Sequence, residues 1–340
     1  MTAVLLVYCE LYSKENCIME NKKIGQLQSG DMVQSFFLIK AADCKITNNK
    51  KSYLDLTLVD QTGEINAKLW DYSPDSQPEY LPNTLVRVRG SAHEWQGKMQ
   101  LRVDKIRVAT EEDDLDIGDF VPAAPYSPEF MYAEIEGYIH KIKNQDIHDI
   151  VSRIIADHKE KLLLYPAAKQ NHHAIRSGLM YHIMTMLRMG EKVSEIYVGL
   201  NKDLLFAGVI LHDIAKTAEM NASELGIVSE YTVEGELLGH IIQGIKMIDQ
   251  TATQIGADPE ISLLLQHMIL SHHYEPEYGS PKRPMIPEAE ILHHLDMIDA
   301  RMYDMQKVLG NVEEGKLSEK VWLLNNRKLY KSSIQNENNG

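Results

Sequence analysis

Apolar residues change their spacing about one third of the way along this chain of 340 residues. Between residues 31 and 108 they alternate with polar residues, which is typical of strands that bury one face. From about Phe130 to Leu324 they recur at intervals of three and four residues, which indicates amphipathic helices. We therefore predict two domains, an all-β domain followed by an all-α domain.

The first domain is predicted to contain five strands, at residues 32–40, 52–59, 64–70, 85–89 and 99–108. Turns are expected at residues 60–63 and 96–98. Five short strands within about 80 residues favour a small closed barrel of the OB type. The alternation places one set of side chains inside this barrel: Val86, Val88, Leu101, Val103, Ile106 and Val108.

The outer surface of the predicted barrel is basic, although the whole chain has a net charge of −14. Residues 34–109 hold 11 Lys/Arg and 9 Asp/Glu, so their net charge is +2. The predicted outward residues of interest are Tyr53, Lys68, Trp70, Arg87, Arg89, Trp95, Arg102 and Arg107. Cations that neutralise phosphates, interleaved with aromatic rings, suit a strand of nucleic acid. The alternatives are a solvated sheet face or a plain interaction module.

The expected domain bounds follow from composition. We predict a disordered leader at 1–18, the barrel at 19–110, an extended acidic and proline-rich linker at 111–129, the helical domain at 130–325 and a polar, frayed tail at 326–340. The leader lacks a basic start and a cleavage site, so a secretory signal is not expected. No apolar run approaches the roughly 20 residues of a membrane span.

The three cysteines, Cys9, Cys17 and Cys44, form no C-x-x-C pair. A disulfide framework or a thiolate zinc site is therefore not predicted, and a reducing, cytoplasmic location fits. The sequence leaves a homo-oligomer open.

Histidines are concentrated in the helical half, where 13 of the 14 lie. Together with carboxylates they form an ordered set: His182, His212, Asp213, His240, His272, His273, Asp296 and Asp299. Residues 204–211 are nearly all apolar and lead directly into His212 and Asp213. Because a lone buried charge is costly, this pair must be partnered or bound to a cation.

Taken singly, several of these residues have another interpretation. His240 can be a core histidine, His272 and His273 can be a pair at a helix C-terminus, and Asp299 can pair with Arg301 or Lys307. Taken together, imidazoles and carboxylates without thiolates favour Mn²⁺, Fe²⁺ or Zn²⁺ in a divalent metal site.

Other residues are expected to contact a phosphate or nucleotide. Lys216 follows His212 by four residues and can neutralise charge in a transition state or help protonate a leaving oxygen, the alternative being a surface lysine. A loop with Ser280, Lys282 and Arg283 can hold a terminal nucleotide, the alternative being an ordinary turn. A weaker prediction gives phosphate contacts to His172, His173 and Arg176.

The ordered set resembles the HD phosphohydrolase superfamily, an all-helical fold with the signature His…His-Asp…Asp. The resemblance implies that His182, His212, Asp213 and Asp296 are the core metal ligands, with Asp296 matching better than Asp299. It also implies that His240 and His272 or His273 hold a second ion. In a site of two metals, Asp213 can be the bridge.

A narrower resemblance is to the YhaM family of bacterial 3′–5′ exoribonucleases, in which an OB domain precedes the HD domain. It rests on residues 166–168, 178–182, 271–273, 277–281 and 288–293. It implies a manganese-preferring exonuclease that acts on single-stranded RNA and, less well, on single-stranded DNA. Tyr274 departs from the glycine expected after the histidine pair, and Tyr278 from the usual phenylalanine.

Two alternatives remain. One is an HD phosphohydrolase of a cyclic dinucleotide or nucleoside polyphosphate, although residues 278–281 depart from the Gly-Tyr-Pro element of the cyclic-dinucleotide branch. The other is a non-catalytic, nucleic-acid-binding regulator with an OB barrel.

Overall fold

The computed structural model describes residues 22–47, 49–74, 78–115, 117–169 and 173–334. The chain divides into two compact units, residues 1–122 and 123–340. Each unit has its own apolar core. The predicted leader at 1–18 lies outside the described residues.

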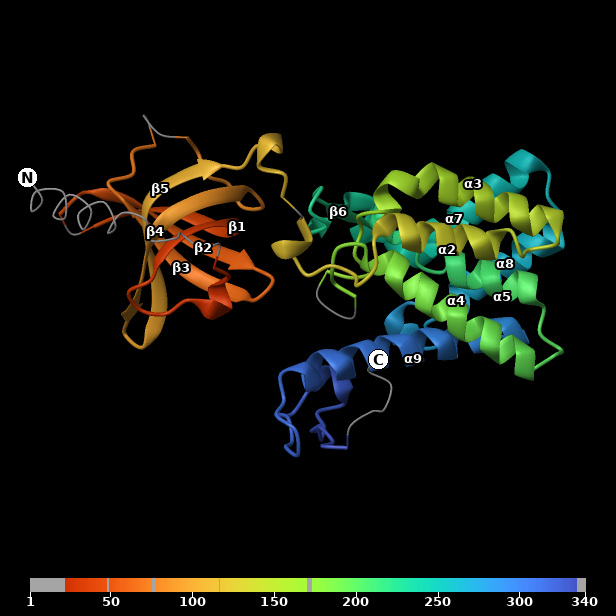
Figure 1. Cartoon of the computed structure of the whole chain (residues 1–340). Coiled ribbons are helices and arrows are strands. Elements are labelled where there is room, and N and C mark those ends of the chain that lie inside the picture. Colours follow the sequence, from red (N-terminus) through yellow and green to blue (C-terminus); the bar gives the residue numbers. More distant parts are fainter. Residues whose placement is uncertain (1–21, 48, 75–77, 116, 170–172, 335–340) are drawn as a thin grey trace, which may run out of the picture. The chain divides into compact units, whose positions relative to one another are not determined.

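Five strands form the first unit: β1 (Met32–Ile46), β2 (Ser52–Asp60), β3 (Gly63–Trp70), β4 (Leu85–Trp95) and β5 (Lys98–Val108). They close into a barrel in the order β1-β2-β3-β5-β4 (Figure 1). Neighbouring strands are antiparallel except for the parallel pair β3–β5. The predicted OB-like barrel is confirmed, and Val86, Val88, Leu101 and Val103 point into its core.

Strand β1 is longer than predicted because a bulge between Ile39 and Ala41 lets it bend. Its first half pairs with β4 and its second half with β2, which closes the barrel. Val108, predicted to point inward, is 41% exposed. It is the last residue of β5, where solvent reaches the end of the strand.

The linker predicted at 111–129 is not extended throughout. Short 3-10 turns form at Glu111–Asp113 and Ile117–Asp119. The carboxylate of Asp113 accepts two hydrogen bonds from the Arg107 guanidinium, at 2.7 and 2.6 Å. Phe120 and Val121 are buried. The Arg107 ion pair offsets the acidic repulsion on which the prediction rested. Residues 111–122 of the segment belong to the barrel unit, and residues 123–129 to the helical unit.

The second unit is helical. Its helices are α2 (Pro128–Ile139), α3 (Gln145–Leu162), α4 (Gly178–Ile196), α5 (Lys202–Leu211), α6 (Lys216–Glu219), α7 (Val233–Ile255), α8 (Pro259–Ser271) and α9 (Pro287–Gly310), with a hairpin of β6 (Met220–Ala222) and β7 (Val228–Tyr231). Helix α5 is central: Leu204 to Leu211 are all buried, and α5 contacts α2, α3, α4, α8 and α9.

Local signals fix the helix ends. The predicted start at Asp258 is confirmed, since its carboxylate accepts from the Glu260 amide at 2.8 Å and Pro259 opens α8. Helix α7 is kinked at Gly239, whose φ of 67° suits a residue without a side chain.

The described part of the predicted polar tail is ordered by pairing. Leu317 and Tyr330 form an antiparallel bridge, as do Val321 and Arg327, and Leu329 is buried. No helix among the described residues is long and apolar enough to cross a bilayer.

Candidate metal centre

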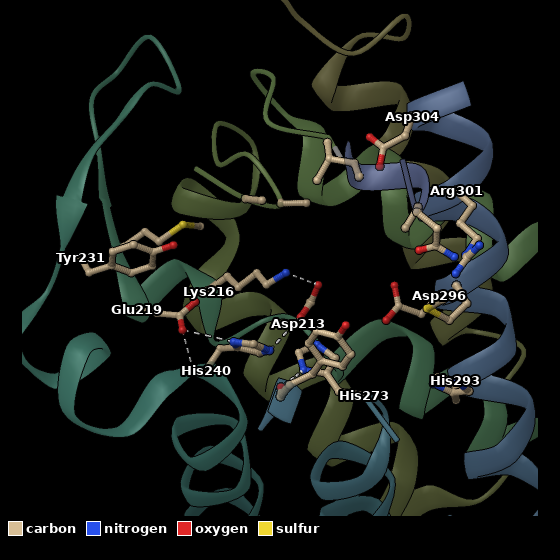
Figure 2. Close-up of a pocket in the computed structure, with 18 residues that line it drawn as sticks. Asp213, Lys216, Glu219, Tyr231, His240, His273, His293, Asp296, Arg301 and Asp304 are labelled. Atoms are coloured by element: carbon tan, nitrogen blue, oxygen red, sulfur yellow. Dashed lines mark hydrogen bonds and ion pairs between the residues drawn. The ribbon is translucent and has the colours of Figure 1, made fainter. Parts of the chain in front are cut away.

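The predicted ligand residues come together at one end of α5. His182 lies in α4, and His212 and Asp213 follow α5. His240 follows the kink in α7, His272 and His273 follow α8, and Asp296 lies in α9. Asp213, His240, His273 and Asp296 border a cavity of about 470 Å³. Figure 2 shows Asp213, Asp296, His240, His273 and Lys216 directed toward the same space.

Asp213 is the shared member of two clusters. Its Oδ2 lies 3.3 Å from His212 Nε2, and its Oδ1 lies 3.3 Å from His240 Nε2 and 3.9 Å from His272 Nε2. Candidate ligand atoms lie within 4.8 Å of one another in His182, His212 and Asp213, and again in Asp213, His240, His272 and His273. The carboxylate is therefore placed to bridge two cations.

The Nδ1 atom of each of three histidines, the one turned away from the centre, already makes a hydrogen bond. His212 Nδ1 donates to the Val209 carbonyl at 2.8 Å, and His272 Nδ1 donates to the Ile269 carbonyl at 2.7 Å. A carbonyl oxygen can only accept, so each Nδ1 carries the proton and each Nε2 presents a lone pair. His273 makes the same bond to the Tyr278 carbonyl. This arrangement is typical of metal-binding histidines.

The Nε2 atoms of two buried histidines face each other. His182 Nε2 lies 3.2 Å from His212 Nε2, and both rings are fully buried. His182 Nδ1 donates to Asp299 Oδ2 at 2.7 Å, and its Nε2 lies 3.4 Å from Asp296 Oδ1. Burial alone lowers the pKa of His182, but Asp296 and Asp299 raise it to about 10. Positive charge, a proton or a cation, is thus strongly stabilised here.

Several buried polar atoms at the centre lack a hydrogen-bond partner among the described residues: Asp213 Oδ1, His240 Nε2 and His272 Nε2. Each orphaned buried group costs about 1–3 kcal/mol. Burial lowers the pKa of His272 and His273, which keeps both imidazoles neutral and able to coordinate. The residues present therefore fit one or two divalent cations.

The two carboxylates of α9 have different positions. Asp296 lines the cavity. Asp299 is buried and accepts from His173 Nε2 at 2.6 Å as well as from His182. Asp299 therefore orients His182, and Asp296 is the better-placed ligand. His173, predicted to contact phosphate, instead supports Asp299, and His172 lies outside the described residues.

Lys216 lies at the centre, as predicted, but not because a continuous helix connects it to His212. Helix α5 ends at Leu211, and α6 starts at Lys216 itself. The Lys216 Nζ nevertheless lies 2.7 Å from Asp213 Oδ2, and the side chain is buried and lines the cavity. A surface lysine is excluded. Burial lowers the pKa of Lys216, but Asp213 outweighs this and raises it, so the ammonium stays charged.

The predicted nucleotide-holding loop is only partly accessible. Ser280 is fully buried, and its Oγ accepts from the His273 amide at 3.0 Å, so it orders the His273 backbone. Lys282 is exposed. Arg283 lies 3.6 Å from Glu275 Oε1 and over the Tyr274 ring. The contact predicted for Ser280 is therefore corrected, because its side chain cannot reach a substrate.

Other residues at the cavity were missed by the sequence analysis. Glu219 accepts from the His240 amide at 3.0 Å and from His240 Nδ1 at 3.2 Å. Tyr231, Arg301 and Asp304 also line the cavity (Figure 2). Of these residues, only Glu219 could have been suspected from the sequence, because it lies three residues after Lys216.

On the barrel, part of the predicted binding face assembles. The rings of Tyr53 and Trp70 lie 4.8 Å apart between centroids. Lys68 Nζ lies 5.3 and 5.8 Å from them, and Lys68 is in register with Arg102. Trp95 is 60% exposed at the end of β4.

Residues 179–301 match the family model described as HD domain. Among solved structures, a solution structure of the second OB-fold domain of replication protein A from Methanococcus maripaludis is 21% identical, covering 26% of this chain and 94% of that chain, with a TM-score of 0.22. A crystal structure of a domain of replication protein A from the same organism is 26% identical, with coverages of 26% and 94% and a TM-score of 0.23. An OB domain from Thermoplasma acidophilum is 18% identical, with coverages of 26% and 84% and a TM-score of 0.22.

The helical unit combines this match with a His and Asp centre suited to divalent cations. The chain therefore contains an HD domain, the domain of a superfamily of metal-dependent phosphohydrolases, preceded by a closed five-stranded barrel of the OB type.

Proposed function

We propose that this chain is a metal-dependent 3′–5′ exoribonuclease that hydrolyses single-stranded RNA and, less well, single-stranded DNA. The observation that carries the proposal is Asp213, which lines the cavity and whose two oxygens face two groups of histidine nitrogens. The resemblance to YhaM exoribonucleases and the barrel that precedes the HD domain both support it.

His182, His212, Asp213 and Asp296 would hold one ion, and Asp213, His240, His272 and His273 a second. A donor set of imidazole and carboxylate without thiolate favours Mn²⁺, with Fe²⁺ and Zn²⁺ as alternatives. Such ions supply Lewis acidity toward phosphate oxygens and make water a stronger nucleophile.

The protein's own groups account for the rest of the proposed reaction. Lys216 would contact a non-bridging phosphate oxygen and stabilise the charge that develops there. Tyr231 offers a ring at the cavity wall, and Arg301 offers a cation. Burial of the centre limits competing water, which strengthens these electrostatic contacts.

The barrel would hold the strand upstream of the bond that is cut. Tyr53 and Trp70 present adjacent rings on which bases can stack, and Lys68 and Arg102 lie beside them. We also propose that the protein works in the cytoplasm. The exposed free thiol of Cys44 fits a reducing compartment.

The test is to incubate 5′-end-labelled single-stranded RNA with Mn²⁺ and resolve the products on a gel. We expect a ladder that shortens one nucleotide at a time from the 3′ end, and arrest at a 3′-phosphate or a stable hairpin. Asp213→Ala should abolish cutting and leave RNA binding intact. Asp157→Ala, a change of the same type at an exposed residue of α3, should cut normally.

Two results would contradict the proposal. Hydrolysis of cyclic dinucleotides or nucleoside polyphosphates with intact RNA would favour a small-nucleotide phosphohydrolase. RNA binding without cutting under any divalent ion would favour a regulator.

A further inference from the structure

A second group of basic side chains lies on barrel strands other than those that carry Tyr53 and Trp70. It borders a cavity of about 330 Å³. The lining residues are Gln34, Arg87, Arg89, Lys105, Ile106 and Arg107. Four of these six are cations and none is an acid. We call this cavity the β1–β4–β5 groove.

Cross-strand register arranges the groove in two rows. Phe36, Arg87 and Arg107 form one row, and Gln34, Arg89 and Lys105 form the next. Rows two residues apart along a strand are about 7 Å apart. Arg87 thus lies directly opposite Arg107, and Arg89 opposite Lys105. Like charges in such pairs destabilise a sheet, so folding alone does not explain the arrangement.

Among the residues that the structure describes, three of the four groove cations lack a carboxylate partner, unlike several other basic side chains of the barrel unit. Lys23, Lys40 and Lys51 each pair with an acidic side chain. In the groove, Arg107 is paired with Asp113. The three remaining cations, Arg87, Arg89 and Lys105, make no ion pair within the described part of the chain.

Aromatic packing holds two of the guanidinium groups in place. The guanidinium carbon Cζ lies 5.4 Å from the centroid of the Phe36 ring in Arg87 and 5.8 Å from it in Arg107. Such cation–π contact restrains an arginine without neutralising it. Arg87 is therefore both restrained and without a carboxylate partner in the described chain, and Arg89 and Lys105 add uncompensated positive charge beside it. An arginine fork matches the oxygens of a phosphate.

We propose that the β1–β4–β5 groove binds backbone phosphates of a single-stranded nucleic acid, as a subsite separate from the Tyr53–Trp70 rings. This proposal rests on the proposed function in one respect, which is that the ligand is a single-stranded nucleic acid. Strand β5 connects the two subsites, since Arg102 faces Lys68 of β3 and Lys105 faces Arg89 of β4. A short strand can occupy the rings alone, whereas a long strand also fills the groove.

The experiment measures binding of fluorescein-labelled oligouridine to the full chain by anisotropy, with EDTA present to prevent cutting. Strands of about 5 and about 20 nucleotides bracket the site size of one OB domain. In Arg87→Gln/Arg89→Gln/Lys105→Gln, affinity for the long strand should fall at least about tenfold at moderate salt. The slope of log K against log salt should weaken by about 2, because each phosphate contact contributes about 0.7 on a single strand. The short strand should lose less than about threefold.

Two further variants test the mechanism. Lys23→Gln/Lys40→Gln/Lys51→Gln changes the net charge equally but removes paired lysines, and should bind the long strand within about twofold of wild type. Phe36→Leu should weaken long-strand binding but keep the salt slope, since every cation remains. Circular dichroism melting checks that each variant is folded.

The proposal is overturned if the groove variant binds the long strand as tightly as wild type, or if the paired-lysine control loses as much. Inorganic tripolyphosphate that competes as well as the long strand would also overturn it, in favour of a free polyanion. A second assay, hydrolysis of bis-p-nitrophenyl phosphate with Mn²⁺, reports on the metal centre alone. It therefore distinguishes failure of the groove proposal from failure of the proposed function. Hydrolysis that persists while groove variants bind normally refutes the groove alone, and groove-dependent binding without any hydrolysis refutes the activity alone.

Discussion

Asp299 acts on the proposed centre through His182, one of the candidate ligands. Its carboxylate accepts from both His173 and His182 and does not line the cavity. Asp299→Asn keeps the shape but removes the charge, so His182 is held less firmly. We expect Mn²⁺ affinity to fall roughly 10- to 100-fold, measured by calorimetric titration. Asp157→Asn should bind Mn²⁺ normally, and unchanged affinity in Asp299→Asn would refute this role.

The same carboxylate predicts a pH dependence of stability. Burial raises the pKa of Asp299, but hydrogen bonds from His173 and His182 outweigh it and lower the pKa from 3.8 to about 2. A carboxyl with a lowered folded-state pKa stabilises the fold above its unfolded value and loses that contribution as the pH falls. Urea unfolding of chelated protein should therefore weaken between about pH 4 and pH 2. In Asp299→Asn the decline over this window should be shallower, and an identical profile would contradict the assignment.

Glu219 orients His240 in the same way as Asp299 orients His182. Glu219→Ala removes the acceptor of both the His240 amide and its Nδ1. We expect the second ion to bind about tenfold or more weakly, with the first ion retained. Titration of metal-free protein with Mn²⁺, followed by electron paramagnetic resonance, should show the stoichiometry fall from two toward one. Glu224→Ala, an exposed glutamate in the loop between β6 and β7, is the control; equal loss in both variants would refute the prediction.

At the scale of elements, the centre depends on how closely α5 packs against its neighbours. A Cβ at Gly208 would lie 2.2 Å from Met268 Cε and 3.4 Å from Leu292 Cδ2. Gly208→Ala should therefore lower the free energy of unfolding by about 1–3 kcal/mol, because the buried Met268 side chain must repack within a filled core. Chemical denaturation measures this change.

The matched control is Gly137→Ala in α2. A Cβ there meets nothing within 4 Å. The substitution should raise the free energy of unfolding by about 0.5–1 kcal/mol, since alanine is the better helix former. If both substitutions shift stability in the same direction, close packing at Gly208 is not the cause.

At the scale of the whole molecule, each unit buries its own core and is expected to unfold on its own. The proposed metal ligands all lie in the helical unit. Saturating Mn²⁺ should stabilise that unit by about 2.7 kcal/mol at a concentration 100 times the dissociation constant. Calorimetry with Mn²⁺ or EDTA should show one transition that moves and one that does not. A barrel transition that moved equally would place metal binding elsewhere.

The sequence by itself determined the order and type of the two units. Period-two alternation predicted the five strands, and the apolar run before His212 predicted the buried helix α5. Both signals are local, because burial of one face or of a whole segment is written into neighbouring residues. The set of ligand-type residues could be collected in the same way, since every member lies at or in an apolar stretch.

Only the tertiary structure decided what each polar residue does. Asp296 and Asp299 are three residues apart on one helix, yet one faces the cavity and the other supports His182. Ser280 is buried rather than available to substrate. Arg107 folds the acidic segment back onto the barrel instead of leaving an extended linker. Each outcome depends on a partner distant in sequence or on a strand register, and spacing along the chain carries neither kind of information.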